Sequence, residues 1–354
     1  MATESQGPRI SVIIPARNAE STLPACLRAI AASSLLPFET ILVSDASSDG
    51  TDDVAAAAGV RVVRNERRQG AAYARNVGAR AAHGDIFFFV DADCVVQRDT
   101  FALGLEAFLQ GADVIFGSYT SETTAGGFLA QFKNYQHHHT HQRGQTIQTS
   151  FWSGCGAITR PAFEAIEGFD VSLHACEDIE FGWALTQAGY QVELVKAMQV
   201  EHLKTYSLLG LIRSDLRARA IPWTRLIRAG RGEMGKLNTG RNGVLATVWT
   251  GVFGLALLAS PLWPAAAPAA LVALAGMAWH SRALLSFIHT RRGILFTVGS
   301  IAALALHYSI CGVGFVAGHL AKPYPRQRAA VPEYRYAERT QRAIDASPVV
   351  LERS

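Results

Sequence analysis

Apolar residues at the start of the chain follow two different spacings. Short runs rich in β-branched or aromatic residues, as buried strands are, cover 10–14, 40–43, 60–63 and 86–90. Between them, apolar residues recur at helical spacing in 19–32, 54–58 and 71–82. Strands that alternate with helices predict an α/β fold, with a mostly parallel sheet and helices on both faces.

Polar residues directly follow three of these strands. Arg17 and Asn18 come after the first, Ser44 to Ser47 after the second, and Asp91 and Asp93 after the fourth. Ligands of parallel sheets bind at these carboxyl ends. Because strand side chains repeat every two residues, both carboxylates can reach one Mg²⁺ or Mn²⁺ that also binds a diphosphate. Taken alone, the pair could also be an acidic turn.

Glycine-rich nucleotide-binding motifs are absent from the sequence. No G-x-G-x-x-G follows the first strand and no Walker loop occurs, which argues against a dinucleotide cofactor. Asp45, at a strand end, could accept a hydrogen bond from a base or a ribose. Arg75 could offset the charge of a diphosphate, or it could be a solvated helix residue.

The next segment is less regular. A helix is expected at 101–109, a strand at 113–116 and an amphipathic helix at 126–141. The last helix ends in His137, His138, His139 and His141, which form either a solvated helix end or part of an active-site rim. Beyond it, the small residues Gly154, Cys155 and Gly156 would let the backbone approach a ligand, and the neighbouring Trp152 could stack on a sugar or a base.

A second carboxylate pair stands at the start of a predicted helix. Of Glu177 and Asp178, one could be a helix cap, and Asp178 could be a general base. Strands are expected at 191–195 and 198–200. His202, which follows them, is either a metal ligand or a structural residue.

Charge divides the chain. Residues 1–202 contain 14 Lys/Arg and 23 Asp/Glu, a net charge of −9, whereas 203–243 contain 9 and 2, a net charge of +7. The overall charge of +4 is therefore an average of opposites and does not indicate a nucleic-acid partner. The five cysteines show no paired or metal-type spacing, which predicts reduced thiols in a cytoplasm-facing protein and no zinc site.

The C-terminal part has the composition of membrane helices. Residues 244–281 lack charged side chains and, as one helix, would be about 57 Å long, well beyond a hydrocarbon core of about 30 Å. Pro261, Pro264 and Pro268 supply a break, which predicts two spans. A third uncharged stretch contains Gly314-x-x-x-Gly318, a possible packing face. The expected segments are a disordered start at 1–8, a catalytic domain at 9–203, basic juxtamembrane helices at 204–243, a membrane region at 244–320 (spans 244–262, 264–281 and 294–320) and a polar tail at 321–354.

The positive charges predict on which side of the membrane the catalytic domain lies. Arg282, Arg291 and Arg292 between the second and third spans predict a cytoplasmic catalytic domain, and 1–9 lack the apolar core of a signal peptide. We therefore expect a multi-pass protein of the inner (plasma) membrane. Three spans would put the tail outside, although it carries 7 basic and 4 acidic residues, so its side stays open.

In order and in motifs, the segment from Ile10 to Leu226 resembles a family 2 glycosyltransferase with the GT-A fold. The motifs are Ile13-Ile-Pro-Ala-Arg-Asn18, Ser44-Asp-Ala-Ser-Ser-Asp-Gly-Thr51, Ala74-Arg-Asn76, Asp91-Ala-Asp93, Gly154-Cys-Gly156, Gly168-Phe-Asp170 and Glu177-Asp178. The resemblance implies transfer of a sugar, with inversion, from a UDP- or GDP-linked donor, using Mg²⁺ or Mn²⁺ and one carboxylate base.

The resemblance also implies residue roles. Asp91 would contact the ribose or the sugar, Asp93 would bind the metal, and Asp178 would deprotonate the acceptor hydroxyl. His202 would be a further metal or diphosphate contact. The other residues expected to bind the donor are Pro15, Arg17, Asn18, Asp45, Ser47 and Arg75. Those expected at the rim between donor and acceptor are Trp152, Gly154, Cys155, Gly156, Glu177, Arg217, Arg219 and Trp223.

The sequence also departs from the family pattern. Ser44 stands where an acidic residue is common in the family. Ala184 stands where an Arg often follows the Glu-Asp pair. The Gln-x-x-Arg-Trp motif of polymerising relatives is missing. We therefore expect a single transfer. The basic block beside the membrane favours a lipid acceptor, such as a polyprenyl phosphate or a lipid-linked glycan. The alternatives are a processive synthase and a non-catalytic, membrane-anchored sugar-nucleotide-binding protein. The sugar, the acceptor and the oligomeric state stay open.

Overall fold

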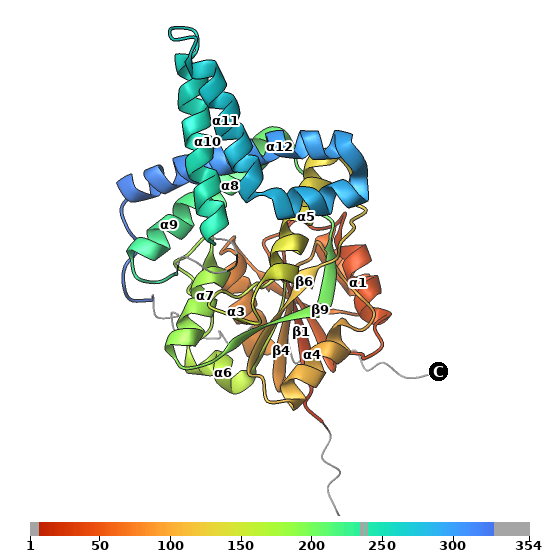
Figure 1. Cartoon of the computed structure of the whole chain (residues 1–354). Coiled ribbons are helices and arrows are strands. Elements are labelled where there is room, and N and C mark those ends of the chain that lie inside the picture. Colours follow the sequence, from red (N-terminus) through yellow and green to blue (C-terminus); the bar gives the residue numbers. More distant parts are fainter. Residues whose placement is uncertain (1–6, 234–236, 238–239, 329–354) are drawn as a thin grey trace, which may run out of the picture.

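The computed structural model describes residues 7–233, 237 and 240–328. Within this part of the chain, the strands form one nine-stranded sheet in the order β3-β2-β1-β4-β8-β6-β9-β5, with β7 paired to β9. A layer of helices lies against one end of the α/β domain, and a helical hairpin projects from that layer (Figure 1). The predicted start at 1–8 and tail at 321–354 lie mostly outside the described residues.

The first half of the sheet is parallel, as the sequence predicts. The strands β1 (Ile10–Ala16), β2 (Glu39–Asp45), β3 (Arg61–Asn65) and β4 (Ile86–Val90) pair in parallel. They are connected by α1 (Leu23–Ala31), α2 (Thr51–Ala57) and α3 (Ala71–Ala81). The polar loops that follow these strands lie together at their carboxyl ends.

The second half of the sheet is mixed. It contains β5 (Cys94–Val96), β6 (Val114–Tyr119), β7 (Ile147–Gln148), β8 (Cys155–Thr159) and β9 (Val192–His202). β8 runs antiparallel between β4 and β6, and β9 is parallel to β6 but antiparallel to β5 and β7. The two strands expected at 191–195 and 198–200 are one long strand, β9. The predicted α/β fold with helices is confirmed. The continuous parallel order is confined to β3, β2, β1 and β4, and beyond β4 the parallel pairing among the described strands is that of β6 with β9.

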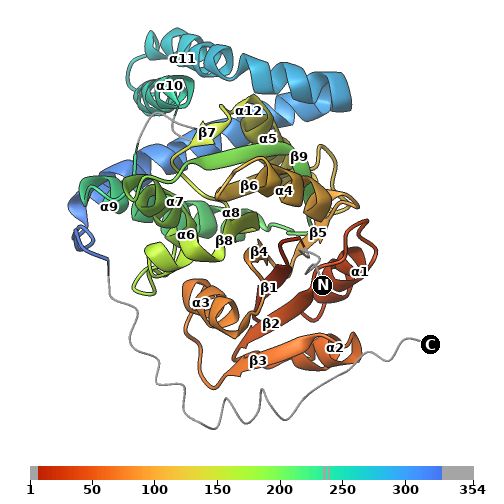
Figure 2. The same ribbon diagram turned by 90° about the horizontal axis from the view of Figure 1, so that it is seen from below.

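Helices cover both faces of the sheet because the side chains of the central strand alternate between two cores. Phe87 and Phe89 belong to one apolar cluster, and Ile86, Phe88 and Val90 belong to the other. The helices α3, α6 (Arg160–Ala165) and α7 (Glu177–Gln187) pack on the first face, and α1, α2 and α4 (Thr100–Leu109) on the second (Figure 2). The buried β4 therefore fixes the position of the carboxylates that follow it.

The helical layer begins with α5 (Phe128–Arg143) and continues after the sheet. The helix α8 (Leu208–Asp215), the π-helical turn η1 (Leu216–Ala220) and α9 (Ile221–Arg228) follow one another without interruption. The helices α10 (Arg241–Ala259) and α11 (Ala266–His280) form the projecting hairpin, and α12 (Arg282–Leu320) runs across its base (Figure 1). The helix α12 bends at Gly293, whose φ of 73° is in the region that favours glycine.

Three predicted spans correspond to helices of different character. Among the described helices, α10 and α12 are long and apolar enough to cross a membrane, whereas α11 has only 15 residues. The pair Gly314 and Gly318 does not pack against another predicted span. It faces Ala220 in η1 and Thr224 in α9, which lie next to the catalytic domain.

Candidate active site

Arg75 joins carboxylates that are far apart in the sequence. Its side chain lies in α3 and is buried, with 3% of the residue exposed. Nη2 is 2.8 Å from Oδ1 of Asp91, after β4, and Nη1 is 2.9 Å from Oε1 of Glu177, the first residue of α7. Burial opposes the charge of Arg75, but the charges of Asp91 and Glu177 outweigh it and raise the pKa of the guanidinium. Arg75 is thus a buried clamp and not a solvated helix residue.

Asp178 lies next to this clamp and is an unusually basic carboxylate. Burial and the charge of Glu177 raise the pKa of Asp178 to about 7, although Arg75 works in the opposite direction. Its Oδ1 accepts a hydrogen bond of 2.9 Å from the N–H of Ile179. A carboxylate with a pKa near neutrality can take up a proton in a reaction, which is the property of a general base.

The start of α7 is held in a strained conformation. Cys176, its N-cap, has a left-handed φ of 57°, which costs a residue with a side chain on the order of 1 kcal/mol or more. The Cys176 thiol donates to the carbonyl of Ala218, 3.5 Å away, so η1 packs against this turn. The contact with η1 therefore fixes the direction in which the side chains of Glu177 and Asp178 point from the helix.

Asp93 and His202 form a group that fits a divalent cation. The antiparallel pairing of β5 with β9 sets Cys94 opposite His202, and Nε2 of His202 is 3.3 Å from Oδ2 of Asp93. Burial raises the pKa of Asp93, but the hydrogen bond and charge of His202 and the charge of Lys204 outweigh this and hold it below its ordinary value. A carboxylate and an imidazole suit Mn²⁺ or Mg²⁺.

Cys94 is the third member of this group, whose ligand atoms lie within 4.8 Å of one another. Its side chain is fully buried, and burial raises the pKa of the thiol well above its ordinary value. A protonated thiol is a poor ligand for hard cations. We therefore assign the metal-binding capacity to Asp93 and His202.

Asp45, the last residue of β2, organises the loop that follows β3. Its Oδ1 accepts hydrogen bonds from Asn65 Nδ2 at 3.0 Å and from the N–H of Gln69 at 2.8 Å, and its Oδ2 accepts one from the N–H of Gly70 at 2.8 Å. These bonds fix the loop that leads into α3. A carboxylate can accept about four hydrogen bonds, which leaves capacity for a base or ribose.

The loops after β1 and β2 are joined to each other. The N–H of Ser48 donates to Asn18 Oδ1 at 2.9 Å, and the N–H of Asn18 donates to Ser47 Oγ at 3.2 Å. Asn18 and Ala46 have left-handed φ values of 52° and 55°. Strained backbone of this kind gathers at ligand-binding sites. Pro15 is partly buried beside these loops, and Arg17 is exposed.

An aromatic stack forms the wall on the β6 side. Tyr119 stacks on Trp152 with ring centroids 4.2 Å apart and on His137 at 5.0 Å. Trp152 thus has one face covered by protein. Burial lowers the pKa of His137 well below its ordinary value and that of His141 to about 4, so both rings are neutral.

The histidine run of α5 therefore has a mainly structural role. His141 packs against Trp152, with centroids 5.5 Å apart. His138 and His139 face the other way and contact Phe287 of α12, each with a centroid distance of 5.6 Å. The run is neither a solvated helix end nor a metal cluster among the described residues. It joins the site wall to the helical layer.

A small pocket of about 10 Å³, enough for about one water molecule, adjoins His202, with a lining that includes Lys133, His137, His202, Lys204 and Tyr206. The sequence did not single out Lys133, Lys204 or Tyr206. The available signals were the position of Lys204, two residues after His202, and a lysine within the apolar pattern of α5. Lys133 is paired with Asp215 and His137 is neutral, so Lys204 is the lining residue that suits an anionic group such as a phosphate.

The predicted rim residues have different positions. The carbonyl of Gly154 accepts a hydrogen bond of 3.4 Å from the N–H of Asp91, which places it at the site. Cys155 and Gly156, also predicted at the rim, are the first two residues of β8, where Cys155 pairs with Val90 at the end of β4, and both are buried. Their small size serves close packing against neighbouring strands.

The basic residues predicted at the rim also differ in position. Arg219 faces the pocket, with Nη1 3.1 Å from Nε2 of His137. Arg217, two residues earlier in η1, is exposed. Trp223 packs against an apolar cluster that contains Leu173 and Leu226, at the foot of α7. The contact of η1 with the start of α7 brings this basic segment beside Asp178.

The comparisons with known proteins agree with this arrangement. The family model described as Glycosyl transferase family 2 matches residues 11–166. An uncharacterized glycosyltransferase of Haemophilus influenzae is 39% identical over 186 residues, which are 50% of this chain and 62% of that protein. Glycosyltransferase AglE of Haloferax volcanii is 25% identical over 197 residues, 52% of this chain and 64% of AglE. The chain thus spans less than two thirds of the length of these relatives.

The similarity extends to solved structures. The mannosyltransferase PcManGT from Pyrobaculum calidifontis, in complex with GDP-Man and Mn²⁺, has a TM-score of 0.51 and 18% identity. The match covers 89% of this chain and 87% of that one, and at this identity it shows the fold alone. Residues 11–166 therefore match the family 2 glycosyltransferases, and the domain that contains them has the GT-A fold of this neighbour.

Proposed function

We propose that the chain is an inverting, metal-dependent glycosyltransferase that moves one sugar from a nucleotide-sugar donor to a membrane lipid or lipid-linked acceptor. The observation that carries the proposal is the clamp of Arg75. It holds Asp91, at the donor end of the site, and Glu177, next to the basic carboxylate Asp178, in one buried group. A donor contact and a candidate base are thereby fixed relative to each other.

The donor side is assigned to the carboxyl ends of β1, β2 and β4. Asp45, Asn18 and Ser47 would bind the nucleoside, and Asp91 the ribose or sugar. A divalent cation, when held by Asp93 and His202, would supply positive charge opposite the leaving diphosphate. The fold neighbour PcManGT was solved with GDP-Man and Mn²⁺, which supports a UDP- or GDP-linked donor and this choice of metal.

The transfer step requires a proton acceptor. The acceptor O–H would give its proton to the Asp178 carboxylate while its oxygen bonds to the anomeric carbon. The bond from that carbon to the diphosphate oxygen breaks, and the electron pair leaves with the diphosphate. The basic side chains of Lys204 and Arg219 would stabilise phosphate charge in the adjoining pocket.

The basicity of Asp178 bears on the acceptor. A polyprenyl phosphate offers an oxygen that is already anionic and needs no base. A hydroxyl of a lipid-linked glycan or glycolipid does need one. Between the two acceptors, the raised pKa of Asp178 supports the hydroxyl. The apolar hairpin and the basic segment at 204–243 support a site at the cytoplasmic face of a membrane.

The test is an assay of purified protein in membranes or nanodiscs. UDP- and GDP-linked sugars are offered with a membrane lipid extract, and both nucleoside-diphosphate release and glycolipid formation are measured with and without Mn²⁺. We expect one donor to give both products only with the metal. Full turnover by Asp178→Asn, or long polymeric products, would refute the proposed mechanism. Nucleotide binding without any turnover would favour a non-catalytic protein.

A further inference from the structure

The long helix α12 is attached to the catalytic domain where it begins. Arg292 donates to Oε1 of Gln131 in α5, and Nη1 of Arg291 is 3.8 Å from Oε1 of Glu122. One turn later, the ring of Phe296 packs against that of Phe128, with centroids 4.7 Å apart. The part of α12 that follows the bend at Gly293 therefore starts in contact with α5.

The middle of α12 contacts α8, η1 and α9, which lie next to the catalytic domain. Nδ1 of His307 is 3.5 Å from Oδ2 of Asp215 in α8. A Cβ at Gly314 would lie 2.3 Å from the Cβ of Ala220, and one at Gly318 would lie 2.6 Å from the Cβ of Thr224. Only glycine permits this approach, so one face of α12 is fitted to η1 and α9.

The end of α12 leads into a strap, residues 321–328, which binds the catalytic domain. Nη1 of Arg228 donates to the carbonyl of Ala321 at 2.7 Å, and Nε of Arg225 donates to that of Lys322 at 2.7 Å. Arg328 donates to the carbonyls of Ile166 and Gly168, and its Nε is 3.0 Å from Oε1 of Glu180. The strap thus reaches the helix that carries Asp178.

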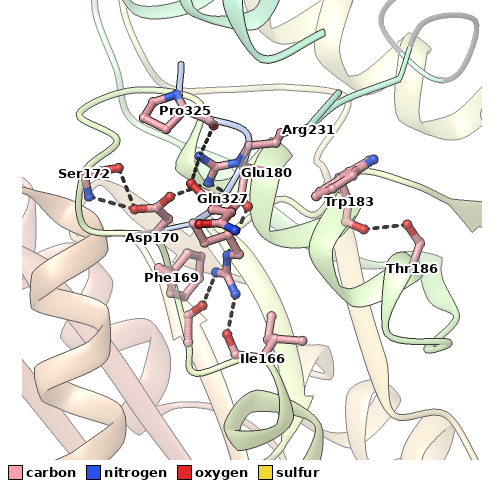
Figure 3. Close-up of polar contacts among 12 residues, drawn as sticks. Ile166, Phe169, Asp170, Ser172, Glu180, Trp183, Thr186, Arg231, Pro325 and Gln327 are labelled. Atoms are coloured by element: carbon pink, nitrogen blue, oxygen red, sulfur yellow. Dashed lines mark hydrogen bonds and ion pairs between the residues drawn. The ribbon is translucent and has the colours of Figure 1, made fainter. Parts of the chain in front are cut away.

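A buried ion cluster holds the strap in place. Arg231 bonds to Asp170, and its Nη2 is 2.9 Å from Oε1 of Glu180, with all three side chains at most 1% exposed. Its Nη1 donates to the carbonyl of Pro325 at 3.2 Å (Figure 3). These side chains are shielded from water, and the strap contacts them through Pro325 and Arg328, so the strap packs on the folded catalytic domain.

These contacts are incompatible with a helix that crosses a bilayer. The 27 residues from Ile294 to Leu320 would measure about 40 Å at about 1.5 Å per residue, and crossing would separate their ends by a core of about 30 Å. Both ends touch one domain instead. The opposite face of this helix is apolar and exposed, with Leu295, Val298, Val313, Val316 and Leu320.

The hairpin of α10 and α11 is the part that suits entry into lipid. It carries no charged side chain between 244 and 281, and its tip exposes Leu262 and Trp263. At the tip, the N–H groups of Leu262 and Trp263 donate to Ala259, and that of Ala266 donates to Trp263. Pro261 and Pro264 have no N–H. These features lower the number of N–H groups at the tip that would face lipid without a partner.

We propose that only the hairpin enters the bilayer and that α12 lies in the plane of the membrane, with its apolar face toward lipid and its other face on the catalytic domain. The chain enters and returns, so the C-terminal strap lies on the same side as the catalytic domain. The third predicted span, 294–320, is thereby replaced by an in-plane helix. The 7 basic residues of 321–354 then fall on the cytoplasmic side, as the positive-inside rule requires.

The first test uses the full chain with a protease-cleavable epitope tag at each terminus, in bacterial membranes. In spheroplasts we expect both tags to resist external protease, and in inverted vesicles we expect both to be lost. Tags on opposite faces, or a mixture of orientations, would overturn the proposal. This result does not depend on enzymatic activity, so it is independent of the proposed function.

The second test measures depth. Ser309 is exposed near the middle of α12, and Ser309→Cys in a Cys311→Ser background gives a labelling site there. With a fluorophore at this site, we expect strong quenching by lipids that carry a nitroxide at the headgroup level. Quenching by nitroxides near the bilayer centre would show a crossing helix and overturn the proposal. Leu262→Cys, at the hairpin tip, is the matched control for a deep position.

Discussion

Two buried aspartates, Asp178 and Asp215, show how the same side chain is prepared for opposite roles. Around Asp178, the carboxylates Asp91 and Glu177 share one cation, Arg75. Burial and the charge of Glu177 raise the pKa of Asp178 to about 7. Negative charge is in excess in this group, and the excess is relieved when Asp178 takes up a proton.

Asp215 has the reverse environment. Its Oδ2 is 3.0 Å from Nζ of Lys133, and its Oδ1 is 3.6 Å from Nη1 of Arg219. Burial raises the pKa of Asp215, but the hydrogen bond of His307 and the charges of Lys133 and Arg219 outweigh it and hold the pKa well below its ordinary value. This carboxylate stays ionised and joins α5, α8 and α12.

The difference between Asp178 and Asp215 shows where in this fold a carboxylate can act as a base. The cluster of Arg231 and Arg328 with Asp170 and Glu180 has as many guanidinium groups as carboxylates, and it too is structural. Balanced clusters hold elements together. The group at Asp178 has three carboxylates for one guanidinium, and there the pKa of a carboxylate rises to about 7, the basicity that a proton transfer needs.

The largest expected effect comes from removing the basic carboxylate. Asp178→Asn should lower kcat by about 10²- to 10⁴-fold, because a positioned general base contributes about that much. Donor binding should persist, which isothermal titration with the nucleotide would check. Asp53→Asn, an exposed position on α2, is the matched control and should keep full activity. An active Asp178→Asn variant would remove Asp178 from the mechanism.

The stability of the same variants tests the comparison directly. Because the pKa of Asp178 is raised on folding, its ionisation destabilises the fold as pH rises from about 4 to about 7, so Asp178→Asn should unfold at a higher temperature than wild type at pH 8. Asp215→Asn should do the opposite and cost about 3 to 5 kcal/mol, since it leaves Lys133 buried without its partner. Thermal unfolding at pH 8 measures both, and shifts of equal sign would contradict the comparison.

The second-largest effect on activity is expected from a change of Arg75, the clamp between Asp91 and Glu177. Arg75→Lys keeps the charge but cannot bond Asp91 and Glu177 at once, since an ammonium lacks the fork of the guanidinium. Misplacement of about 1 Å can cost about 100-fold, so we expect kcat to fall by about that factor. Arg80→Lys, exposed at the end of the same helix, is the control. Single-turnover kinetics would distinguish lost chemistry from lost donor binding.

The sequence predicted those features that depend on local spacing. The positions of Asp91 and Asp93 follow from the period of two at the end of β4, and the start of α7 at Glu177 follows from a polar segment before a helical pattern. The contact of Asp93 with His202 depends on pairing between strands about a hundred residues apart, and only the resemblance to a family suggested it. Spacing within one segment carries no information on such pairing.

Other features could not be decided from composition alone. Gly154, Cys155 and Gly156 share a small size, and small residues serve close packing inside a sheet as readily as approach to a ligand. The uncharged length of 294–320 fits both a span and an in-plane helix. What distinguishes them is the surface that Gly314 and Gly318 approach, and Ala220 and Thr224 lie almost a hundred residues earlier. The structural role of Asp215 depends equally on distant partners.

The third effect concerns the attachment of α12. Gly314→Leu would force a side chain into Ala220 and should destabilise the docked helix by about 1 to 3 kcal/mol. Limited proteolysis within the strap and a lower unfolding temperature would report it. Gly251→Leu in α10, where a Cβ meets open space, should change neither measurement. Equal behaviour of the two variants would contradict the docking of α12 through this glycine face.

The smallest effect is a pH dependence. If Asp178 must be ionised to accept a proton, kcat/KM should fall about tenfold per unit as pH drops below about 7, and it should level off above that value. Donor binding, measured separately at the same pH values, should not share this inflection. Glu177→Gln removes a charge that raises the pKa of Asp178, so it should move the inflection to lower pH and lower the plateau through the damaged clamp. An inflection that stays in place would mean that the excess of negative charge is not what makes Asp178 basic, and the contrast with Asp215 would then need another cause.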